Sequence, residues 1–213
     1  MEFLYCAVFG YLIGTINPSY IVAKIRGFDI REKGSGNAGA SNALMLLGKL
    51  VGVLCALLDI AKAALVIWAA EHLFPDFFYA FAVTGVACIL GHIFPFYMRF
   101  RGGKGLACLG GMIFIFNRWV FLFMLLGEIV IALVTNYICF VPITASVIFP
   151  VIYGVMRQDL IGALILCVAT AVMLGRHVQN LKRIREGTEM RLSFLWNKDK
   201  EVERVLSSRD ANR

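Results

Sequence analysis

The sequence predicts an all-α, polytopic integral membrane protein of about seven transmembrane helices, with an external N-terminus and a cytoplasmic C-terminus. Three observations lead to this prediction. Of the 213 residues, 60% are hydrophobic and only 16% are charged, whereas a soluble domain carries about 25% charged residues. The apolar residues form long runs of about a bilayer's thickness. Compact basic segments separate the runs and fall mainly on one side of the predicted membrane.

Each apolar run predicts one helix. The first run follows Met1 and Glu2 directly, without the basic residues that begin a removable signal peptide. The fourth run is short, so we expect its helix to tilt or to pack inside the bundle. The seven runs cover residues 3–23, 50–70, 77–97, 104–116, 119–136, 139–156 and 160–176.

Lysine and arginine orient these helices. With the N-terminus outside, 18 of the 21 basic residues fall on one face, Arg118 and Arg157 fall on the other, and Lys62 lies within the second run. Cytoplasmic loops accumulate Lys and Arg, so the basic face is predicted to be cytoplasmic. Attraction to anionic lipid headgroups accounts for the net charge of +7 without nucleic acid. Residues 1–191 are predicted to form the membrane domain and residues 192–213 a polar cytoplasmic tail.

The six cysteines stand singly in apolar runs, without a CxxC pair or a neighbouring histidine at metal-ligand spacing. This pattern is typical of small packing residues, so we predict neither a disulfide nor a metal site.

A first polar segment, Gly34-Ser-Gly-Asn-Ala-Gly-Ala-Ser-Asn42, follows the first run. Its glycines free the backbone so that successive N–H groups can point at one anion. The alternative is a flexible linker, but linkers rarely interleave Asn and Ser between basic flanks. We therefore predict an anion-binding loop, with side-chain donors from Ser35, Asn37, Ser41 and Asn42.

A second polar segment combines Gly91-His-Ile-Phe-Pro95 with Phe100-Arg-Gly-Gly-Lys-Gly105 and opens onto the fourth run. An anion loop that leads into a helix uses both free N–H groups and the helix dipole. It is not an ATP-binding P-loop, because Met98 replaces the leading glycine and Gly105 replaces the Ser or Thr after the lysine.

A third segment, from Arg176 to Glu189, follows the last run. At helical spacing, Arg176, Asn180 and Arg183 share a face, and His177 neighbours Asn180. Basic residues after a last span are usually anchors that reach the membrane surface, so the histidine and the asparagine carry the functional interpretation.

Three charged residues lie inside the predicted spans, away from their ends. Asp59 and Lys62, at i and i+3, can pair and offset their burial, either as structural residues or as part of a polar cavity. Glu128 has no local partner, and is either protonated or paired with a basic residue on another helix.

Two anion loops and a cationic helix face on one side of the membrane imply substrates that carry phosphate. Their place at the membrane surface implies that one substrate or product is a lipid. In order and spacing, the three segments resemble the motifs of the bacterial acyl-phosphate:glycerol-3-phosphate acyltransferases, and Leu58-Asp59-x-x-Lys62 resembles a further family element. The resemblance covers the chain up to about Arg191. It implies a seven-helix, monomeric enzyme of the bacterial cell membrane.

That resemblance also implies the reaction. A fatty acyl group passes from acyl phosphate to the 1-hydroxyl of glycerol 3-phosphate, giving lysophosphatidic acid and phosphate in the first step of phospholipid synthesis. No cofactor, coenzyme A or acyl carrier protein takes part.

Chemistry then suggests roles for the motif residues. Ser35, Asn37 and Lys104 would hold phosphate and neutralise charge at the acyl carbonyl, while His177 and Asn180 would orient the acceptor. The base is either a substrate phosphate oxygen or His177, and Ser35 lacks the neighbouring base that a nucleophile needs. The predicted catalytic residues are Ser35, Lys104, His177 and Asn180. The predicted substrate-binding residues are Gly34, Gly36, Asn37, Gly39, Ser41, Asn42, His92, Arg101, Gly102, Gly103, Gly105, Arg176, Arg183 and Glu189, with Asp59 and Lys62 as structural or cavity residues.

Three positions depart from the family pattern. Met45 stands where the family has an arginine, Pro142 where it has a serine, and Ala63 where it has a glycine. Loss of an arginine removes a bidentate phosphate donor, for which Arg31 or Arg101 could substitute. A catalytically altered paralogue or a non-catalytic scaffold is therefore one alternative.

Two alternatives come from other classes. A transporter of a small organophosphate would show inverted repeats, and we find none. A CDP-alcohol phosphotransferase would need clustered aspartates for a divalent metal, and the runs contain only Asp59.

Overall fold

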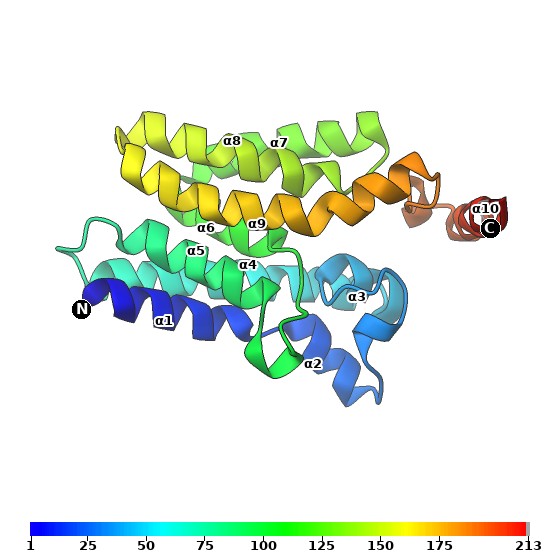
Figure 1. The fold of residues 1–213 in the computed structure, drawn as a ribbon, viewed down its shortest axis with the longest axis horizontal. Helices are drawn as coiled ribbons and strands as arrows, with labels where there is room; N and C mark the ends of the chain where they lie inside the picture. The colour runs from blue at the N-terminus through cyan, green and yellow to red at the C-terminus, as the bar shows by residue number, and fades with distance from the viewer. Residues whose placement is uncertain (212–213) are drawn as a thin grey trace.

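The computed structural model describes residues 1–211, and within that range its regular secondary structure is helical, with no strands. Figure 1 shows its helices arranged in two layers. The helices are α1 (Glu2–Thr15), α2 (Pro18–Ile25), α3 (Ala40–Leu47), α4 (Lys49–Leu73), α5 (Ala80–Ile93), α6 (Leu106–Phe116), α7 (Arg118–Thr135), α8 (Phe140–Arg157), α9 (Leu160–Arg185) and α10 (Lys198–Ala211). Short 3-10 turns occupy Ile30–Glu32, Phe96–Met98 and Leu192–Leu195.

The two layers are joined by the short helix α6 and by a direct contact of α5 with α9. Helices α1, α4 and α5 form one layer, helices α7, α8 and α9 form the other, and α6 packs against α4, α5, α7 and α8 (Figure 1). Six helical segments of the described chain are long and apolar enough to cross a membrane, and α6 is a shorter apolar helix of 11 residues. The prediction of an all-α, multi-pass membrane protein is therefore confirmed, with the fourth run packed inside the bundle.

The first predicted run is not one helix, because it breaks between α1 and α2. Pro18 has no N–H to continue α1, and Asn17 caps α2 by accepting a hydrogen bond from the Tyr20 N–H at 2.8 Å. The Lys62 ammonium donates to the carbonyls of Gly14 (3.0 Å) and Ile16. A charged side chain from α4 thus satisfies carbonyls that the break leaves open within the apolar bundle.

Glycine permits the closest helix contacts in the bundle. A Cβ atom on Gly14 of α1 would lie 2.2 Å from the Cys88 carbonyl oxygen of α5. A Cβ on Gly91 of α5 would lie 2.2 Å from the Tyr11 carbonyl oxygen of α1. Small residues let the backbones of membrane helices approach closely. Helices α1 and α5 therefore pack closely against each other.

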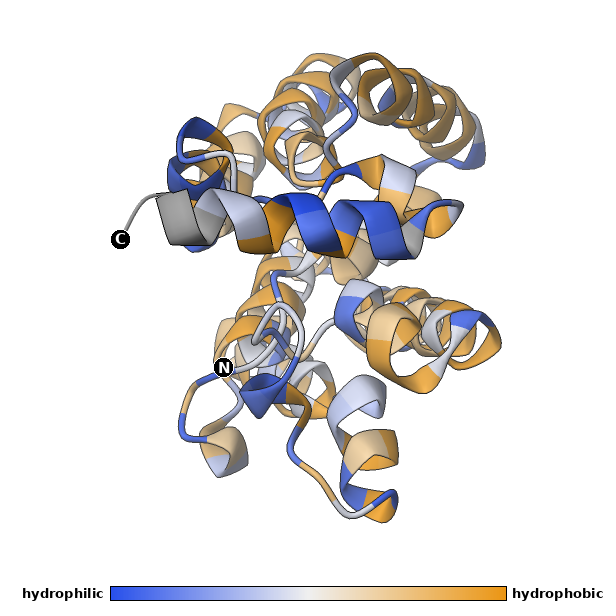
Figure 2. Ribbon diagram, turned by 90° about the vertical axis from the view of Figure 1, so that its right-hand side faces the viewer, coloured by the Kyte–Doolittle hydropathy of each residue, from blue (hydrophilic) through white to orange (hydrophobic). Residues whose placement is uncertain are grey.

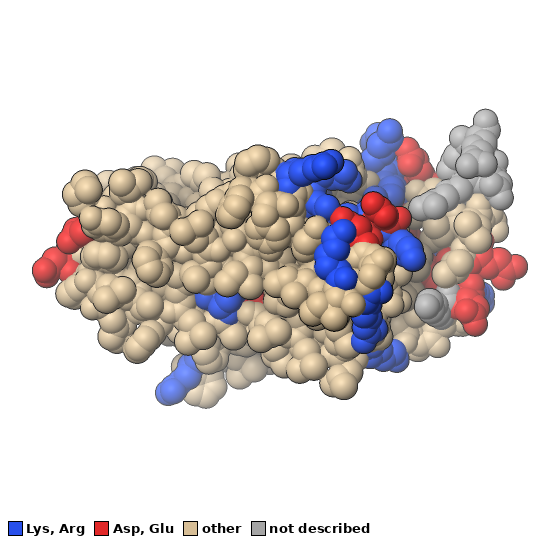
Figure 3. Space-filling model, turned by 90° about the horizontal axis from the view of Figure 1, so that it is seen from below, with Lys and Arg blue, Asp and Glu red and all other residues tan. Residues whose placement is uncertain are grey.

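The basic segments gather toward one end of the bundle. The connections after α2 and α5 and the C-terminal segment lie toward that end, while the turns after α4, α6 and α8 lie at the other (Figure 1). In Figure 3, blue side chains crowd toward one end and the long middle of the molecule is almost uncharged. This arrangement agrees with the charge asymmetry from which the topology was predicted.

Candidate active site

A cavity of about 760 Å³ opens between the two layers toward the basic end. One part of its wall is polar and comes from all three motif segments, with Asp59 of α4. The other part comes from α6, α7 and α8 and is apolar except for Glu128. The polar wall includes Ser35, Gly36, Asn37, Gly39, Ser41, Asp59, His92, Lys104, Gly105, His177, Asn180, Arg183 and Glu189, and the apolar wall includes Leu109, Gly110, Ile113, Phe121, Met124, Val141 and Ala145.

The first loop is held in shape by Asn42, which does not line the cavity. Its amide nitrogen lies 2.9–3.1 Å from the carbonyl oxygens of Ile30, Lys33 and Asn37, and its Oδ1 accepts the Ser35 N–H at 2.9 Å. Its amide hydrogens and its carbonyl oxygen are thus all engaged within the loop. We predicted that Asn42 binds substrate, and in the structure its side chain instead fixes the shape of the first loop.

Gly34 is required beside that asparagine. It has φ +61°, in the left-handed region, and a Cβ there would lie 2.3 Å from the Asn42 Oδ1. Only glycine fits both constraints.

Two helix N-termini face the cavity. Helix α3 begins after Gly39 and helix α6 begins after Gly105, and neither has a side-chain cap. The residues around both starts line the cavity, among them Ser41 and Ala107. The first N–H groups of a helix have no intrahelical partner and carry the positive end of its dipole. The cavity therefore holds two separate sites suited to anions.

Gly102 and Gly103 do not form the predicted cradle. Their N–H groups donate to the carbonyls of Ile93 and His92, each at 3.0 Å, and neither residue lines the cavity. A Cβ on Gly103 would lie 2.0 Å from His92 Nε2. Gly103 is needed because the loop crosses directly over the His92 ring, and Gly102 because a Cβ there would lie 2.1 Å from the His92 carbonyl oxygen. The N–H groups without an intrahelical partner lie instead at the adjacent start of α6.

A chain of hydrogen bonds joins the second segment to the third. The Lys104 ammonium donates to Asn180 Oδ1. The Asn180 amide donates to Glu189 Oε1 at 2.6 Å, and the Arg183 Nε donates to Glu189 Oε2 at 2.6 Å. Glu189 therefore orients two side chains of the site through both of its oxygens, and is not free to bind a cation itself.

Burial lowers the pKa of Lys104 to about 8, an effect that the nearby Glu189 carboxylate opposes. An ammonium that is poorly solvated gains more from binding an anion than one already surrounded by water.

His177 is buried at the cavity wall. Its Nδ1 lies 2.7 Å from the Met173 carbonyl oxygen, which can only accept, so the neutral ring carries its hydrogen on Nδ1. The Nε2 atom then has a lone pair, and it has no hydrogen-bond partner in the described part of the chain. This geometry suits a base or an acceptor for a substrate hydroxyl.

Three predicted arginines lie away from the cavity wall. Arg31 pairs with Asp29 at 2.7 Å and donates to the Met98 carbonyl, and it holds the pKa of the Asp29 carboxyl well below its usual range. Arg176 lies over the Phe94 ring, 6.0 Å from its centroid. Arg101 is exposed. Met45 lies on the cavity wall, at the position where the family has an arginine. Neither Arg31 nor Arg101 lies on that wall to take the place of the missing arginine.

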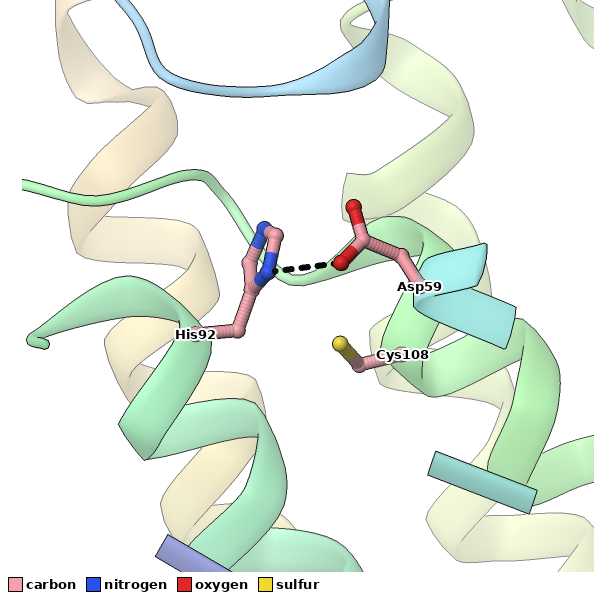
Figure 4. Close-up of side chains that lie close together, drawn as sticks. All are labelled: Asp59, His92 and Cys108. Atoms are coloured by element: carbon pink, nitrogen blue, oxygen red, sulfur yellow. Dashed lines mark ion pairs between the residues drawn. The ribbon is translucent and has the colours of Figure 1, made fainter. Parts of the chain in front are cut away.

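A second polar cluster lies deeper, at Asp59 (Figure 4). Asp59 Oδ1 lies 2.6 Å from the Lys62 ammonium and 3.3 Å from His92 Nδ1, and the ammonium lies 3.1 Å from the same nitrogen. The predicted pairing of Asp59 with Lys62 is confirmed. Ligand atoms of Asp59, His92 and Cys108 come within 4.8 Å of one another. The ammonium already supplies the positive charge beside them, so we assign no metal here.

Two contacts of the site had no signal in the sequence. Glu128, predicted to be either protonated or paired with a basic residue, accepts a hydrogen bond from the Thr144 hydroxyl of α8 at 2.7 Å and has no basic partner among the residues that the structure describes. Part of the C-terminal segment, including Phe194 and Val205, also lines the cavity. Its apolar residues at 202, 205 and 206 have helical spacing, but helical spacing does not indicate which surface the helix covers.

Comparison with known proteins gives a consistent picture. The model of the glycerol-3-phosphate acyltransferase family matches residues 4–187. A glycerol-3-phosphate acyltransferase of Aquifex aeolicus is 34% identical over 194 residues, which cover 90% of this chain and 100% of that protein. One from Clostridioides difficile is also 34% identical, covering 90% and 96%.

Solved structures agree. The crystal structure of PlsY (YgiH), an integral membrane glycerol 3-phosphate acyltransferase, in its glycerol 3-phosphate form superposes with a TM-score of 0.84 at 33% identity, over 92% of this chain and 98% of that one. The lysophosphatidic acid form superposes with a TM-score of 0.80 at 33% identity, over 90% and 95%.

Proposed function

Because this chain belongs to the glycerol-3-phosphate acyltransferase family, we propose that it transfers a fatty acyl group from acyl phosphate to the 1-hydroxyl of glycerol 3-phosphate. The products are lysophosphatidic acid and inorganic phosphate. The chain is thus an integral membrane acyltransferase whose acceptor is glycerol 3-phosphate.

The observation that carries the proposal is the division of one cavity into a polar and an apolar part. The polar part holds Lys104, His177 and two uncapped helix starts. The apolar part continues along α6 as far as Ile113, about 12 Å of helix from Gly105. Such a cavity suits an acyl chain that carries an anionic head, with a second anion beside it.

Two phosphorylated substrates repel each other, and the site offers a separate positive region to each. The start of α3 is one region, and the start of α6 with Lys104 is the other. Holding two reactants together in this way supplies much of the rate of a two-substrate reaction.

The reaction then needs one proton transfer. The 1-hydroxyl oxygen attacks the acyl carbonyl carbon, and the carbon–oxygen bond to phosphate breaks. The hydroxyl proton passes to His177 Nε2 or to an oxygen of the departing phosphate. Ser35 has no described histidine or carboxylate hydrogen-bonded to its hydroxyl, which supports direct transfer over an acyl-enzyme.

A coupled product assay tests the function. Purified protein receives palmitoyl phosphate with and without glycerol 3-phosphate, and both phosphate and lysophosphatidic acid are measured. We expect both products only when the acceptor is present, and no product from palmitoyl coenzyme A. Phosphate release without acceptor would point to a hydrolase, and acceptor uptake into vesicles without product would point to a transporter.

The basic end of the bundle is proposed to face the cytoplasm of a bacterial cell membrane, with a single chain as the active unit. Charge asymmetry supports the orientation. Labelling of a cysteine placed at exposed Lys33, in a variant without native cysteines, checks the orientation. It should react with an impermeant thiol reagent only in inside-out vesicles.

A further inference from the structure

The C-terminal segment is built into the wall of the active site. It lies beyond residues 4–187, which the family model matches. Figure 2 shows α10 lying across the end of the bundle, between the two layers, and Figure 1 shows it end-on beyond α9. Phe194, Val202, Val205 and Leu206 line the cavity, and Phe194 and Val205 are only 8% and 6% exposed.

The segment is fixed at two points. At its start, the Leu192 N–H donates to the Asn136 carbonyl at 2.7 Å, and the Ser193 N–H donates to the Asn136 Oδ1 at 3.1 Å. These bonds tie it to the end of α7. Further along, Glu201 of α10 accepts the Arg191 N–H at 2.8 Å.

Arg204 is the main contact between α10 and the loop that carries Glu189. Its guanidinium donates to the Gly187 carbonyl and to the Glu189 carbonyl, the latter at 2.6 Å. Glu201, one turn earlier, accepts from Arg204 Nη2 at 2.6 Å and from Nε at 3.1 Å. The planar guanidinium reaches the carboxylate and both carbonyls at once, which a lysine cannot reproduce.

Those carbonyls belong to the segment that sets the direction of the Glu189 side chain. Glu189 accepts from Asn180 and from Arg183, and Asn180 accepts from Lys104. A continuous path of hydrogen bonds therefore leads from α10 to the ammonium at the start of α6. Every link is charge-assisted or involves a side chain of the site.

We propose that Arg204 is a positioning residue for the acyl transfer, which holds the main chain at Gly187–Glu189 so that Glu189 orients Asn180, Arg183 and Lys104. The inference rests on the proposed function. It assigns to the C-terminal helix an indirect part in the reaction, although that helix lies outside residues 4–187, which the family model matches.

The test compares Arg204→Met with Lys200→Met in the full-length protein. Lys200 is an exposed cation of the same helix, so its removal controls for a change of charge on α10. Initial rates are measured against glycerol 3-phosphate and against palmitoyl phosphate, with the Tm of each sample. We expect Arg204→Met to lower kcat/KM for glycerol 3-phosphate about tenfold, the value of one charge-assisted hydrogen bond. Lys200→Met should leave it unchanged.

Two further readouts separate positioning from general stability. Glu189 raises the pKa of Lys104 against the effect of burial, so a displaced carboxylate should move the alkaline limb of kcat/KM to lower pH in Arg204→Met. Because Arg204 acts through Glu189, the double variant with Glu189→Gln should lose no more activity than Glu189→Gln alone. Losses that multiply, or an unmoved alkaline limb, would overturn the proposal.

The controls also keep this proposal apart from the proposed function. Product formation by the wild type establishes the reaction. An Arg204→Met variant as active as the wild type would then refute only the positioning role of Arg204. A wild type that forms no lysophosphatidic acid refutes the reaction instead. If Arg204→Met does not fold, Glu201→Gln gives the test, with an expected loss smaller than tenfold and the same alkaline shift. Wild-type kinetics in that variant would equally refute positioning.

Discussion

Replacing Lys104 by alanine is expected to lower kcat/KM by about 10² to 10³ while the protein stays folded. The ammonium lies at the cavity wall, and its side-chain hydrogen-bond partner in the described part of the chain is Asn180. At an effective dielectric constant of about 20, a unit charge about 4 Å from an anion contributes about 4 kcal/mol, which corresponds to nearly a thousandfold. Water that fills the vacated space returns part of that energy.

The pH dependence of the same residue gives an independent check. Burial lowers the pKa of Lys104 to about 8, so the protonated form predominates at neutral pH and is lost as the pH rises through 8. We expect kcat/KM, which reports the free enzyme, to fall along that limb. In Lys104→Arg the guanidinium remains charged, so the remaining activity should show no such limb.

The assay is lysophosphatidic acid formation from palmitoyl phosphate, followed from pH 6 to pH 10, with Tm measured for each variant. Near-normal kcat/KM in Lys104→Ala would refute the assignment of this ammonium to the anion site. An alkaline limb at the same pH in Lys104→Arg would show that another group titrates there.

Three further substitutions test other parts of the site. Met45→Arg should lower the KM for glycerol 3-phosphate about tenfold by adding a charge-assisted donor to the cavity wall; an unchanged or higher KM would show that this wall does not contact phosphate. Gly103→Ala places a Cβ 2.0 Å from His92 Nε2, so we expect loss of activity and a Tm lower by several degrees, from about 1–3 kcal/mol of overpacking; a wild-type Tm would contradict the packing. At Gly110 a Cβ has 3.8 Å to Ile60 and to Phe121, so Gly110→Leu should shift the preferred donor from palmitoyl to shorter acyl phosphates, and an unchanged preference would place the acyl chain elsewhere.

Much of the local chemistry could be predicted from the sequence. Long apolar runs favour the bilayer because water solvates their side chains poorly, and inside the bilayer the backbone must satisfy its own hydrogen bonds as a helix. Basic loops indicate the side on which they stay. Parts of all three motif segments lie at one cavity as predicted, because the first two follow helices that end on the same side and the third begins as the end of α9 on that side. The pair of Asp59 and Lys62 was predictable from one turn of helix.

The roles of single residues within the motifs were less predictable. The sequence pattern cannot distinguish a glycine that binds an anion from one that lets the chain pass over a neighbour, as Gly102 and Gly103 do over His92. Asn42 was predicted from the sequence to bind substrate, but its amide donates hydrogen bonds to carbonyls of its own loop. Arg176 shares a helical face with Asn180 by spacing, yet it turns toward Phe94.

The sequence by itself determined that this protein is a membrane-embedded helical bundle with its polar motifs at one end, because hydrophobicity, charge and helical spacing are properties of short segments. Only the tertiary structure decided which hydrogen-bonding groups remain available to substrate, and that the C-terminal helix lines the site. The physical reason is that a buried donor or acceptor must find a partner, and the partners of Glu189 and Lys62 lie on segments whose approach depends on the packing of the whole chain.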